Sequence, residues 1–308
     1  MWYRSPGFFA YLLFPFAALY LIVIKLRRFL YRIGFLKVTQ FSVPIIVVGN
    51  ITVGGVGKSP LVAYLAQQLQ KKGFKVGLVS RGYGGSDIGQ PQCVTAESDP
   101  VCVGDEPVML VRQTGCPMVV AKNRVAAVEK LLKESDCDVV ISDDGLQHYA
   151  LARDFEIAVI DGERKFGNGF CLPAGPLREP ASRFKDVDLI VTNGIDMQLE
   201  PREICLIQDH QKTLAMTEKP IHLVTAIGNP SRFIQSVESL GFTVIPHIFP
   251  DHYFFGKEDL DYGPDAIVVM TEKDAVKCKH LVDDRHYVLT TKLLVSPRVL
   301  SKVVNSIE

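Results

Sequence analysis

The chain has 308 residues, enough for one or two domains with a sizeable core, and its 34 Lys or Arg residues balance its 34 Asp or Glu residues. The seven cysteines are an odd number and form no Cys-x-x-Cys pair, which argues against a disulfide framework or a zinc site and favours a reducing compartment such as the cytoplasm. We expect no nucleic-acid partner.

The N-terminal stretch 8–24 predicts a membrane helix. It runs for seventeen residues without a charge, FFAYLLFPFAALYLIVI, at the short limit of the roughly 17 to 25 residues that span a bilayer. Basic residues follow, and the positive-inside bias places everything downstream in the cytoplasm: Lys25, Arg27, Arg28 and Arg32. We expect residues 1–36 to form an anchor and a basic interfacial helix. A helix lying in one leaflet and a buried helix of a soluble protein are the alternatives.

Charge is unevenly placed along the chain. Residues 1–86 hold eleven Lys or Arg and no Asp or Glu, so 23 basic and 34 acidic residues remain for the rest. A positive N-terminal region suits phosphate binding and an anionic membrane surface.

Residues 44–65 predict a phosphate-binding loop. The apolar run 45–48 favours a buried strand, the loop ITVGGVGKSP follows, and an amphipathic helix is expected over 59–72. Glycines let successive N–H groups turn onto polyphosphate oxygens, and the helix N-terminus adds its positive dipole end. Lys58 would reach the β- and γ-phosphates of ATP, and the Ser59 hydroxyl would ligate Mg²⁺. The candidate nucleotide-binding residues are Thr52, Gly54, Gly55, Val56, Gly57, Lys58 and Ser59.

This loop departs from the usual pattern, because Thr52 stands where a glycine is common. It resembles the Gly-Gly-Val-Gly-Lys loop of the ATPases that partition cell components, except that Val53 replaces their signature lysine. A glycine-rich turn with an incidental lysine is the structural alternative.

The next elements bring more polar residues to the same edge. A strand over 75–79 precedes Arg81, which either contacts phosphate or is a solvated loop arginine. In Gly-Asp-Glu-Pro, 104–107, Asp105 or Glu106 is expected to be a helix N-cap with the proline in the first turn.

Two further candidate metal ligands follow a strand that is expected over 138–142. Asp143 and Asp144 stand at its carboxyl end, an arrangement that holds Mg²⁺ or its waters in phosphate-binding loop enzymes, although two such residues can also be plain turn formers. With a strand over 117–121 and a helix over 123–133, the alternation predicts an α/β fold: a doubly wound, mainly parallel sheet.

The rest of the chain predicts a second, smaller αβ domain. Strands are expected over 155–160 and 188–192, with a long irregular and therefore functional segment over 161–186 between them. We expect the phosphate-binding domain over 37–195, a connector over 196–220 and the smaller domain over 221–308, with the ligand between the two domains.

Several motifs run nearly from end to end. They are Gly-Asn-x-Thr-x-Gly-Gly-x-Gly-Lys-Ser-Pro at 49–60, Ser-Arg-Gly-Tyr-Gly at 80–84, Gly-Asp-Glu-Pro at 104–107, Asp-Asp-Gly-Leu-Gln-His at 143–148, Leu-Pro-Ala-Gly-Pro-Leu-Arg-Glu-Pro at 172–180, Asp-His-Tyr-Phe at 251–254 and Thr-Glu-Lys-Asp-Ala-Val-Lys at 271–277. Together with the N-terminal helix, they resemble those of the tetraacyldisaccharide 4'-kinases, the lipid A 4'-kinase family.

This resemblance implies transfer of the ATP γ-phosphate to the 4'-hydroxyl of a tetraacylated glucosamine disaccharide 1-phosphate at the inner membrane. It places Asp143 and Asp144 at the metal, places Arg178 and Glu179 in the cleft, and pairs Asp105 with His252 as a catalytic dyad. A sugar hydroxyl is a poor nucleophile until a carboxylate accepts its proton. Because His252 comes from the second domain, activity would depend on domain closure.

Two rival functions use the same loop. Asn193-Gly194-Ile195-Asp196 weakly resembles the guanine-binding motif of switch GTPases, but Gly194 replaces its lysine. A membrane-tethered partitioning ATPase is the other rival, and Val53 argues against it.

Overall fold

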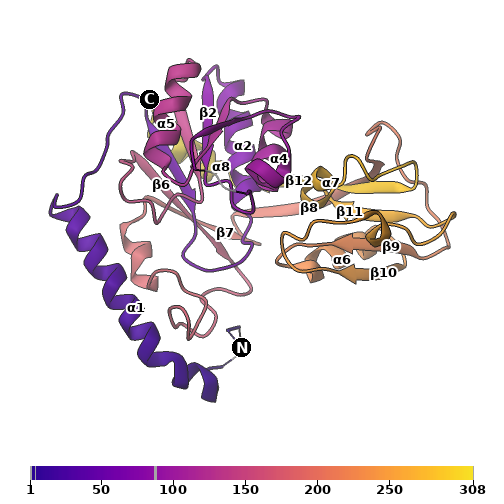
Figure 1. Ribbon diagram of the computed structural model, residues 1–308, viewed down its shortest axis with the longest axis horizontal. Helices are drawn as coiled ribbons and strands as arrows, with labels where there is room; N and C mark the ends of the chain where they lie inside the picture. Colours follow the sequence, from indigo (N-terminus) through magenta and orange to yellow (C-terminus); the bar gives the residue numbers. More distant parts are fainter. Residues whose placement is uncertain (1, 4, 87–88, 308) are drawn as a thin grey trace.

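The computed structural model describes residues 2–3, 5–86 and 89–307, so Met1, Arg4 and Glu308, which belong to the expected terminal segments, lie outside the described part. The described strands form one twelve-stranded sheet that runs through the whole molecule, in the order β3-β4-β2-β5-β1-β6-β7-β8-β12-β11-β9-β10. Figure 1 shows two α/β units joined through this sheet, with helix α1 beside the larger unit.

The large unit contains the predicted doubly wound sheet. Six of its seven strands are parallel, and β3 is antiparallel to β4 at one edge. The central strand β1 lies between β5 and β6 and is buried along its whole length, as expected where helices cover both faces. The strands are β1 (Ile45–Gly49), β2 (Val76–Ser80), β3 (Gln92–Val94), β4 (Met118–Val120), β5 (Val139–Asp143), β6 (Phe155–Asp161) and β7 (Leu189–Asn193).

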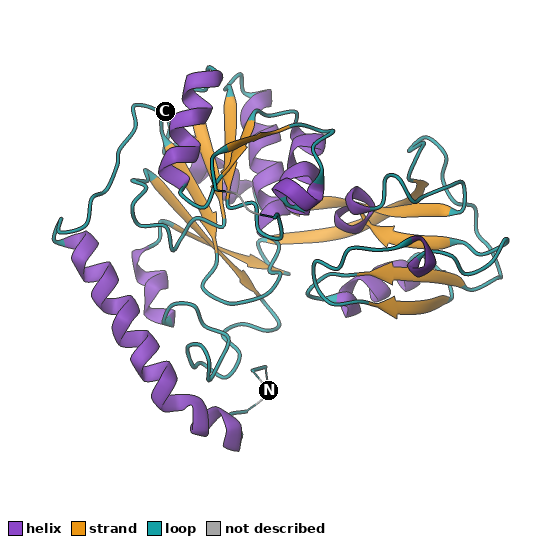
Figure 2. Ribbon diagram, viewed as in Figure 1, coloured by secondary structure: helices purple, strands orange, loops and turns teal. Residues whose placement is uncertain are grey.

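Side chains of β1 alternate between two apolar cores. Ile46 and Val48 pack with α2, α4 and α8 on one face, and Ile45 and Val47 pack with α5 on the other. Figure 2 shows these helices on both sides of the strands. The helices of this unit are α2 (Lys58–Lys71), α3 (Pro100–Val103), α4 (Asp105–Thr114), α5 (Arg124–Glu134), the 3-10 turn η1 (Ala181–Asp186) and α8 (Pro297–Val304).

The small unit continues the sheet. Strands β10, β9, β11 and β12 run parallel, and β8 pairs antiparallel with β12. Helix α6 packs on one face of this sheet through Phe233 and Val237. The elements are β8 (Met197–Leu206), β9 (Ile221–Thr225), α6 (Pro230–Ser239), β10 (Val244–Ile248), the 3-10 turn η2 (Lys257–Asp259), β11 (Val268–Thr271), α7 (Glu272–Lys277) and β12 (His286–Val295).

Strands β8 and β12 form a two-stranded bridge between the units, as Figure 1 shows. Much of the expected connector 196–220 is therefore the ten-residue strand β8, whose middle is exposed and carries few apolar side chains to mark it. After β12 the chain returns to the large unit, where Val299 and Val303 of α8 enter its core. We therefore propose that the small unit ends within β12 and that residues 296–307 belong to the large unit.

Helix α1 (Phe8–Arg32) has 25 residues and continues through the basic residues, as predicted. It is the one helix, within the described ranges, that is long and apolar enough to cross a membrane. Ala10 and Ala17 are buried, whereas most of its large apolar side chains are exposed, including Phe8, Phe16 and Leu19. This exposure argues against the core helix of a soluble protein.

Candidate active site

The loop between β1 and α2 has the backbone that a phosphate cradle needs. Gly54 and Gly57 have φ of +99° and +94°, in the left-handed region that favours glycine. A Cβ on Gly57 would also lie 2.8 Å from Met197 Cε and 2.9 Å from Asn193 Nδ2. Asn193, at the end of β7, donates from Nδ2 to the Val56 carbonyl oxygen at 3.0 Å. The shape of the loop is thus fixed from outside as well as by its glycines.

Lys58 is the first residue of α2 and lies between polar partners. Its Nζ is 3.4 Å from Asn50 Oδ1 and 3.5 Å from Asp144 Oδ1. Arg178 Nη1 approaches the same carboxylate, 3.0 Å from Asp144 Oδ2. Burial works to raise the pKa of Asp144, but Lys58 and Arg178 outweigh it and hold that pKa below its usual range. Two cations therefore meet at one carboxylate beside the glycine loop.

Ser59 lies opposite a buried carboxylate on β5. Its Oγ is 3.1 Å from Asp143 Oδ2 and 3.4 Å from Glu106 Oε2. Burial, followed by the charge of Glu106, raises the pKa of Asp143 to about 7. Asp143 Oδ1 is buried with no hydrogen-bond partner in the described structure. A hydroxyl beside an uncompensated carboxylate fits Mg²⁺, which prefers oxygen ligands.

The protein supplies only part of such a coordination shell. The described residues contain no group of three or more His, Cys, Asp or Glu side chains arranged to hold a metal ion. Mg²⁺ usually keeps several waters and is held by one or two carboxylates with substrate phosphates, so the donor set at Ser59 and Asp143 remains adequate.

Helix α4 begins at Asp105, so neither Asp105 nor Glu106 is its N-cap and that expectation is wrong. Gly104 is the N-cap, with φ +93°, and a Cβ there would lie 2.6 Å from the Tyr83 carbonyl oxygen. Because only glycine suits this position, Asp105 becomes the first helical residue, and its Oδ1 accepts from the Glu106 amide at 2.8 Å. Its other oxygen is left to face the small unit.

Asp105 meets the small unit through His252. Oδ2 of Asp105 lies 3.2 Å from His252 Nδ1, and the aspartate is only 3% exposed. Burial works to raise the pKa of Asp105, but the His252 hydrogen bond and the charges of Lys273 and Lys277 outweigh it, so the pKa stays below its usual range. The carboxylate is therefore held in its ionised form.

Comparison with known proteins decides the family. The family model described as tetraacyldisaccharide-1-P 4'-kinase matches residues 9–308. The chain belongs to the tetraacyldisaccharide 4'-kinase family. A tetraacyldisaccharide 4'-kinase of Coxiella burnetii (strain RSA 331 / Henzerling II) is 49% identical over 297 residues, covering 96% of this chain and 90% of the relative. One of Alkalilimnicola ehrlichii is 47% identical over 313 residues, covering 99% and 94%.

A solved structure supports the same assignment. The crystal structure of LpxK from Aquifex aeolicus in complex with ATP matches with a TM-score of 0.82 and 26% identity, covering 97% of this chain and all of that one. The predicted fold class is confirmed. As a member of the 4'-kinase family, the chain is an ATP-dependent phosphotransferase of lipid A biosynthesis, and neither rival function is supported.

Within this 4'-kinase, Arg178 and Glu179 occupy different environments. Arg178 pairs with Asp144, and its carbonyl oxygen accepts from the Tyr20 hydroxyl of α1 at 3.1 Å. Glu179 is 1% exposed, and its oxygens are held by Gln147 Nε2 at 3.0 Å and by the Tyr149 hydroxyl. Arg178 therefore borders the cradle, whereas Glu179 is enclosed behind it.

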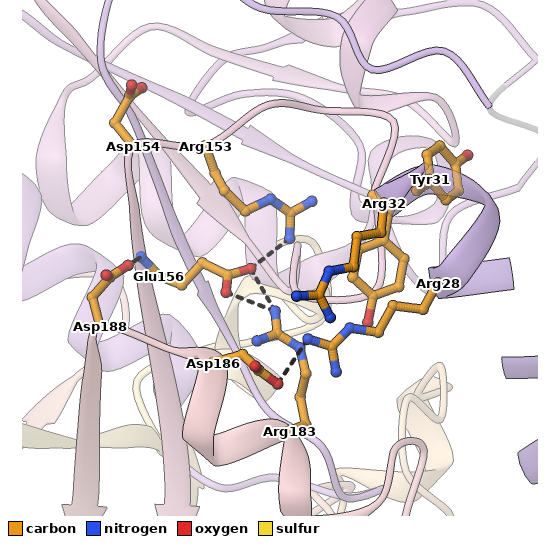
Figure 3. Close-up of a pocket in the computed structure, with 10 residues that line it drawn as sticks. Arg28, Tyr31, Arg32, Arg153, Asp154, Glu156, Arg183, Asp186 and Asp188 are labelled. Carbon is orange, nitrogen blue, oxygen red and sulfur yellow. Dashed lines mark hydrogen bonds and ion pairs between the residues drawn. The ribbon is translucent and has the colours of Figure 1, made fainter. Parts of the chain in front are cut away.

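Tyr149, which contacts Glu179, also lines a hollow of about 540 Å³ that charged side chains of α1 and the large unit surround (Figure 3). Glu156 accepts from Arg153 at 2.7 Å and from Arg183 at 2.6 Å. Arg28 of α1 pairs with Asp186 at 2.7 Å. The basic end of the helix is thus tied by charge to the same part of the enzyme that holds Glu179.

Four residues make contacts at this site that the sequence did not predict. Asn50, Glu106 and Lys273 stand in quoted motifs, but only the folded structure brings them to Lys58, Ser59 and Asp105. Asn193 was considered only as a guanine contact, yet its amide holds Val56. Arg81 lies exposed after β2, and Thr52 is buried beside Asn50.

Proposed function

We propose that Asp105 is the general base of the 4'-kinase and that it acts at the edge of the phosphate cradle. The observation that supports this role is the position of α4. Its first two side chains contact different parts of the protein, one in the cradle and one in the small unit. Glu106 approaches Ser59 of the cradle, and Asp105 approaches His252 of the small unit. A base at this position could accept the proton of a sugar hydroxyl as that hydroxyl attacks the γ-phosphate.

His252 would orient Asp105 rather than react itself. Its Nδ1 is the nearer ring atom, so the imidazole fixes one carboxylate oxygen and leaves the nucleophile to approach from the cradle side. Since the two residues belong to different units, the base would be complete only when the units are docked.

The cradle residues would bind ATP, as the complex of the Aquifex aeolicus relative supports. Amides of Gly54, Gly55, Val56 and Gly57 would surround the phosphates, with Thr52 supporting the loop and Arg81 at its border. Lys58 and Arg178, which pair with Asp144 in the structure, would bind phosphate oxygens instead when ATP is present. Both cations could then balance charge on the transferred group.

Ser59 and Asp143 would hold Mg²⁺, with Asp144 close enough to hold its waters. Bound there, the ion would neutralise phosphate charge. Glu179 would act as a support, because Gln147 and Tyr149 already engage its carboxylate.

We further propose that α1 anchors the catalytic unit at the cytoplasmic face of the inner membrane. Its exposed apolar side chains suit a bilayer, and its basic end suits anionic headgroups. Because Tyr20 contacts the Arg178 backbone, the site would lie near the surface from which a tetraacylated disaccharide 1-phosphate is taken. We expect no role for nucleic acid.

Lipid phosphorylation tests the proposal. Purified protein is incubated with ATP, Mg²⁺ and tetraacyldisaccharide 1-phosphate in mixed micelles, and the lipid extract is analysed by mass spectrometry. A product with one added phosphate, blocked by chelation of Mg²⁺ and absent with Lys58→Ala, is expected. An unchanged lipid with the wild-type enzyme would contradict the assigned reaction.

A further inference from the structure

We propose that Lys273 is a positioning residue for phosphoryl transfer. Its ammonium joins the small unit to the neighbouring carboxylates Asp105 and Glu106 of α4. The inference rests on the proposed role of Asp105 as base. It adds a residue outside the cradle and outside the Asp105 and His252 pair.

Lys273 lies at the centre of the contact between the units. Its Nζ is 3.3 Å from Glu106 Oε1 and 3.9 Å from Asp105 Oδ2, both on α4. From its own unit it is 3.4 Å from Asp251 Oδ1 and 3.4 Å from His252 Nε2. The side chain is 16% exposed, so these charges are only weakly screened by water.

Charge balance explains why a cation is needed here. Asp105 and Glu106 of α4 and Asp251 of the small unit all approach the Lys273 ammonium, and like charges gathered around one point repel one another. Burial lowers the pKa of Lys273, but Glu106, Asp105 and Asp251 outweigh that effect and raise it, so the ammonium stays charged. Lys273 therefore offsets the repulsion among these carboxylates at the contact between the units.

The second lysine of α7 has a different task. Lys277 Nζ is 2.7 Å from Asp274 Oδ1 within the same helix and 4.9 Å from the centre of the Phe255 ring. Its distance to Asp105 Oδ2 is 4.0 Å, and its side chain is 1% exposed. Lys277 is therefore mainly part of the small-unit core, which leaves Lys273 as the cation directed at α4.

Lys273 also connects docking to the cradle. Glu106 is held on one side by Lys273 and on the other by the Ser59 hydroxyl, 3.4 Å from Oε2. The same interface is supported by Val276 of α7, which packs in the core of the large unit, and by Gln113, which donates to Glu272 at 3.1 Å. Removal of the ammonium would leave these contacts in place but would release Glu106 and the base.

The chain offers a matched control for interface charge. Lys279 pairs with Glu97 of the large unit at 2.6 Å, also between the units, but both side chains are about half exposed or more. Such exposed pairs contribute little to stability. Lys279→Met therefore removes a lysine from the same interface without touching the site.

The experiment compares Lys273→Met, Lys273→Arg and Lys279→Met in full-length enzyme, by steady-state lipid phosphorylation and by thermal unfolding. We expect Lys273→Met to lower kcat by about 100-fold, the effect typical of losing a preorganised charge, with the KM for ATP within about threefold of wild type. Lys273→Arg should recover most of kcat because it keeps the charge, and Lys279→Met should stay within about twofold.

Combination with the base variant separates this inference from the proposed function. If Lys273 acts through Asp105, Lys273→Met should cost little more in an Asp105→Asn background. A nearly active Lys273→Met enzyme, or one whose loss lies wholly in the KM for ATP, would overturn the role of Lys273 while leaving the base intact. A fully active Asp105→Asn enzyme with an impaired Lys273→Met enzyme would instead overturn the base assignment, and with it the route proposed for Lys273.

Discussion

Asp105 of α4 and His252 of the small unit meet across the interface, with Oδ2 3.2 Å from Nδ1. His252 has φ +63°, a conformation that costs a non-glycine residue of order 1 to 3 kcal/mol and persists only where the surroundings impose it. Its amide donates to the Ala226 carbonyl oxygen at 3.2 Å, and its ring lies against Tyr83. The small unit thus presents the imidazole from a strained and well-supported turn.

Asp105→Asn should lower kcat by about 100-fold or more while leaving the affinity for ATP nearly unchanged, because the amide cannot accept the hydroxyl proton. Stability should fall as well, because the neutral amide loses the favourable interactions with His252, Lys273 and Lys277 that keep the pKa of Asp105 low, although the N-cap of α4 is Gly104 and is untouched. If the two residues act as one unit, Asp105→Asn with His252→Ala should be little worse than the worse single variant. Steady-state rates at saturating ATP measure all three, and additive losses would show that the two residues act independently.

Lys58→Ala should reduce turnover by roughly 100- to 1000-fold, on the order of 3 to 4 kcal/mol, because the γ-phosphate loses a preorganised charge and donor. Lys75→Ala is the control, since that lysine is 61% exposed and pairs with Asp136 away from the cradle. Single-turnover phosphate transfer measures the chemical step. A Lys58→Ala rate within a few-fold of wild type would move the phosphate site away from the glycine loop.

The cradle could be predicted from the sequence because a strand, glycines, Lys58, Ser59 and a helix follow one another within one short segment. The proposed base and its partner could be named only through a family resemblance, since Asp105 and His252 are 147 residues apart and no local pattern joins them. Lys273 stayed without a role for the same reason.

The missed parts of the fold also have physical causes. Strand β8 crosses between the units with an exposed middle, where Pro201 and the charged residues beside it interrupt the apolar pattern and argue against a strand. Helix α8 shows its apolar face plainly, but the sequence does not say that β12 carries it back to the large unit.

Asp143→Asn should stabilise the protein without Mg²⁺ at pH 8 while abolishing phosphorylation. The folded pKa of about 7 lies above the ordinary 3.8, so the stability linked to protonation is present below about pH 3.8 and is lost as pH rises through 7. An asparagine stays neutral at every pH, so at pH 8 the free energy of unfolding of the variant should exceed that of wild type by about 1 to 3 kcal/mol.

Urea unfolding of both proteins at pH 5 and pH 8 measures this difference, which should shrink at the lower pH. Added Mg²⁺ should raise the stability of wild type and not of the variant. Equal stabilisation of both proteins by Mg²⁺ would place the ion elsewhere.

Removal of residues 1–36 should abolish binding to vesicles that contain anionic phosphatidylglycerol while leaving nucleotide binding intact. The large unit keeps its sheet and both apolar faces in the shortened chain, whereas the exposed apolar side chains of α1 are lost. Lipid turnover should also fall, because Tyr20 no longer supports the Arg178 backbone. Vesicle sedimentation and a fluorescent ATP analogue measure the two properties.

Tyr20→Phe separates these two effects of the truncation. It removes the hydroxyl that contacts Arg178 and leaves the helix apolar, so it should lower turnover about two- to tenfold, as expected for one hydrogen bond, without changing vesicle binding. A truncated protein that still sediments with the vesicles would show that the membrane contact lies outside α1.

Glu272→Gln should flatten the dependence of stability on pH. Burial raises the pKa of this carboxyl to about 7 from 4.5, even though the Gln113 amide that donates to it works in the opposite direction. The stability gained from the neutral form is fully present below about pH 4.5 and is lost as pH rises through 7. A glutamine stays neutral and can still accept from Gln113, so the variant should be more stable than wild type at pH 8 by about 1 to 3 kcal/mol and nearly equal to it at pH 5.

Glu238→Gln, at an exposed position on α6, is the control and should leave the free energy of unfolding unchanged at both pH values. Denaturant unfolding at the two pH values measures the difference, and a Glu272→Gln protein that loses stability at pH 8 would show that the charged carboxylate supports the contact between α4 and α7.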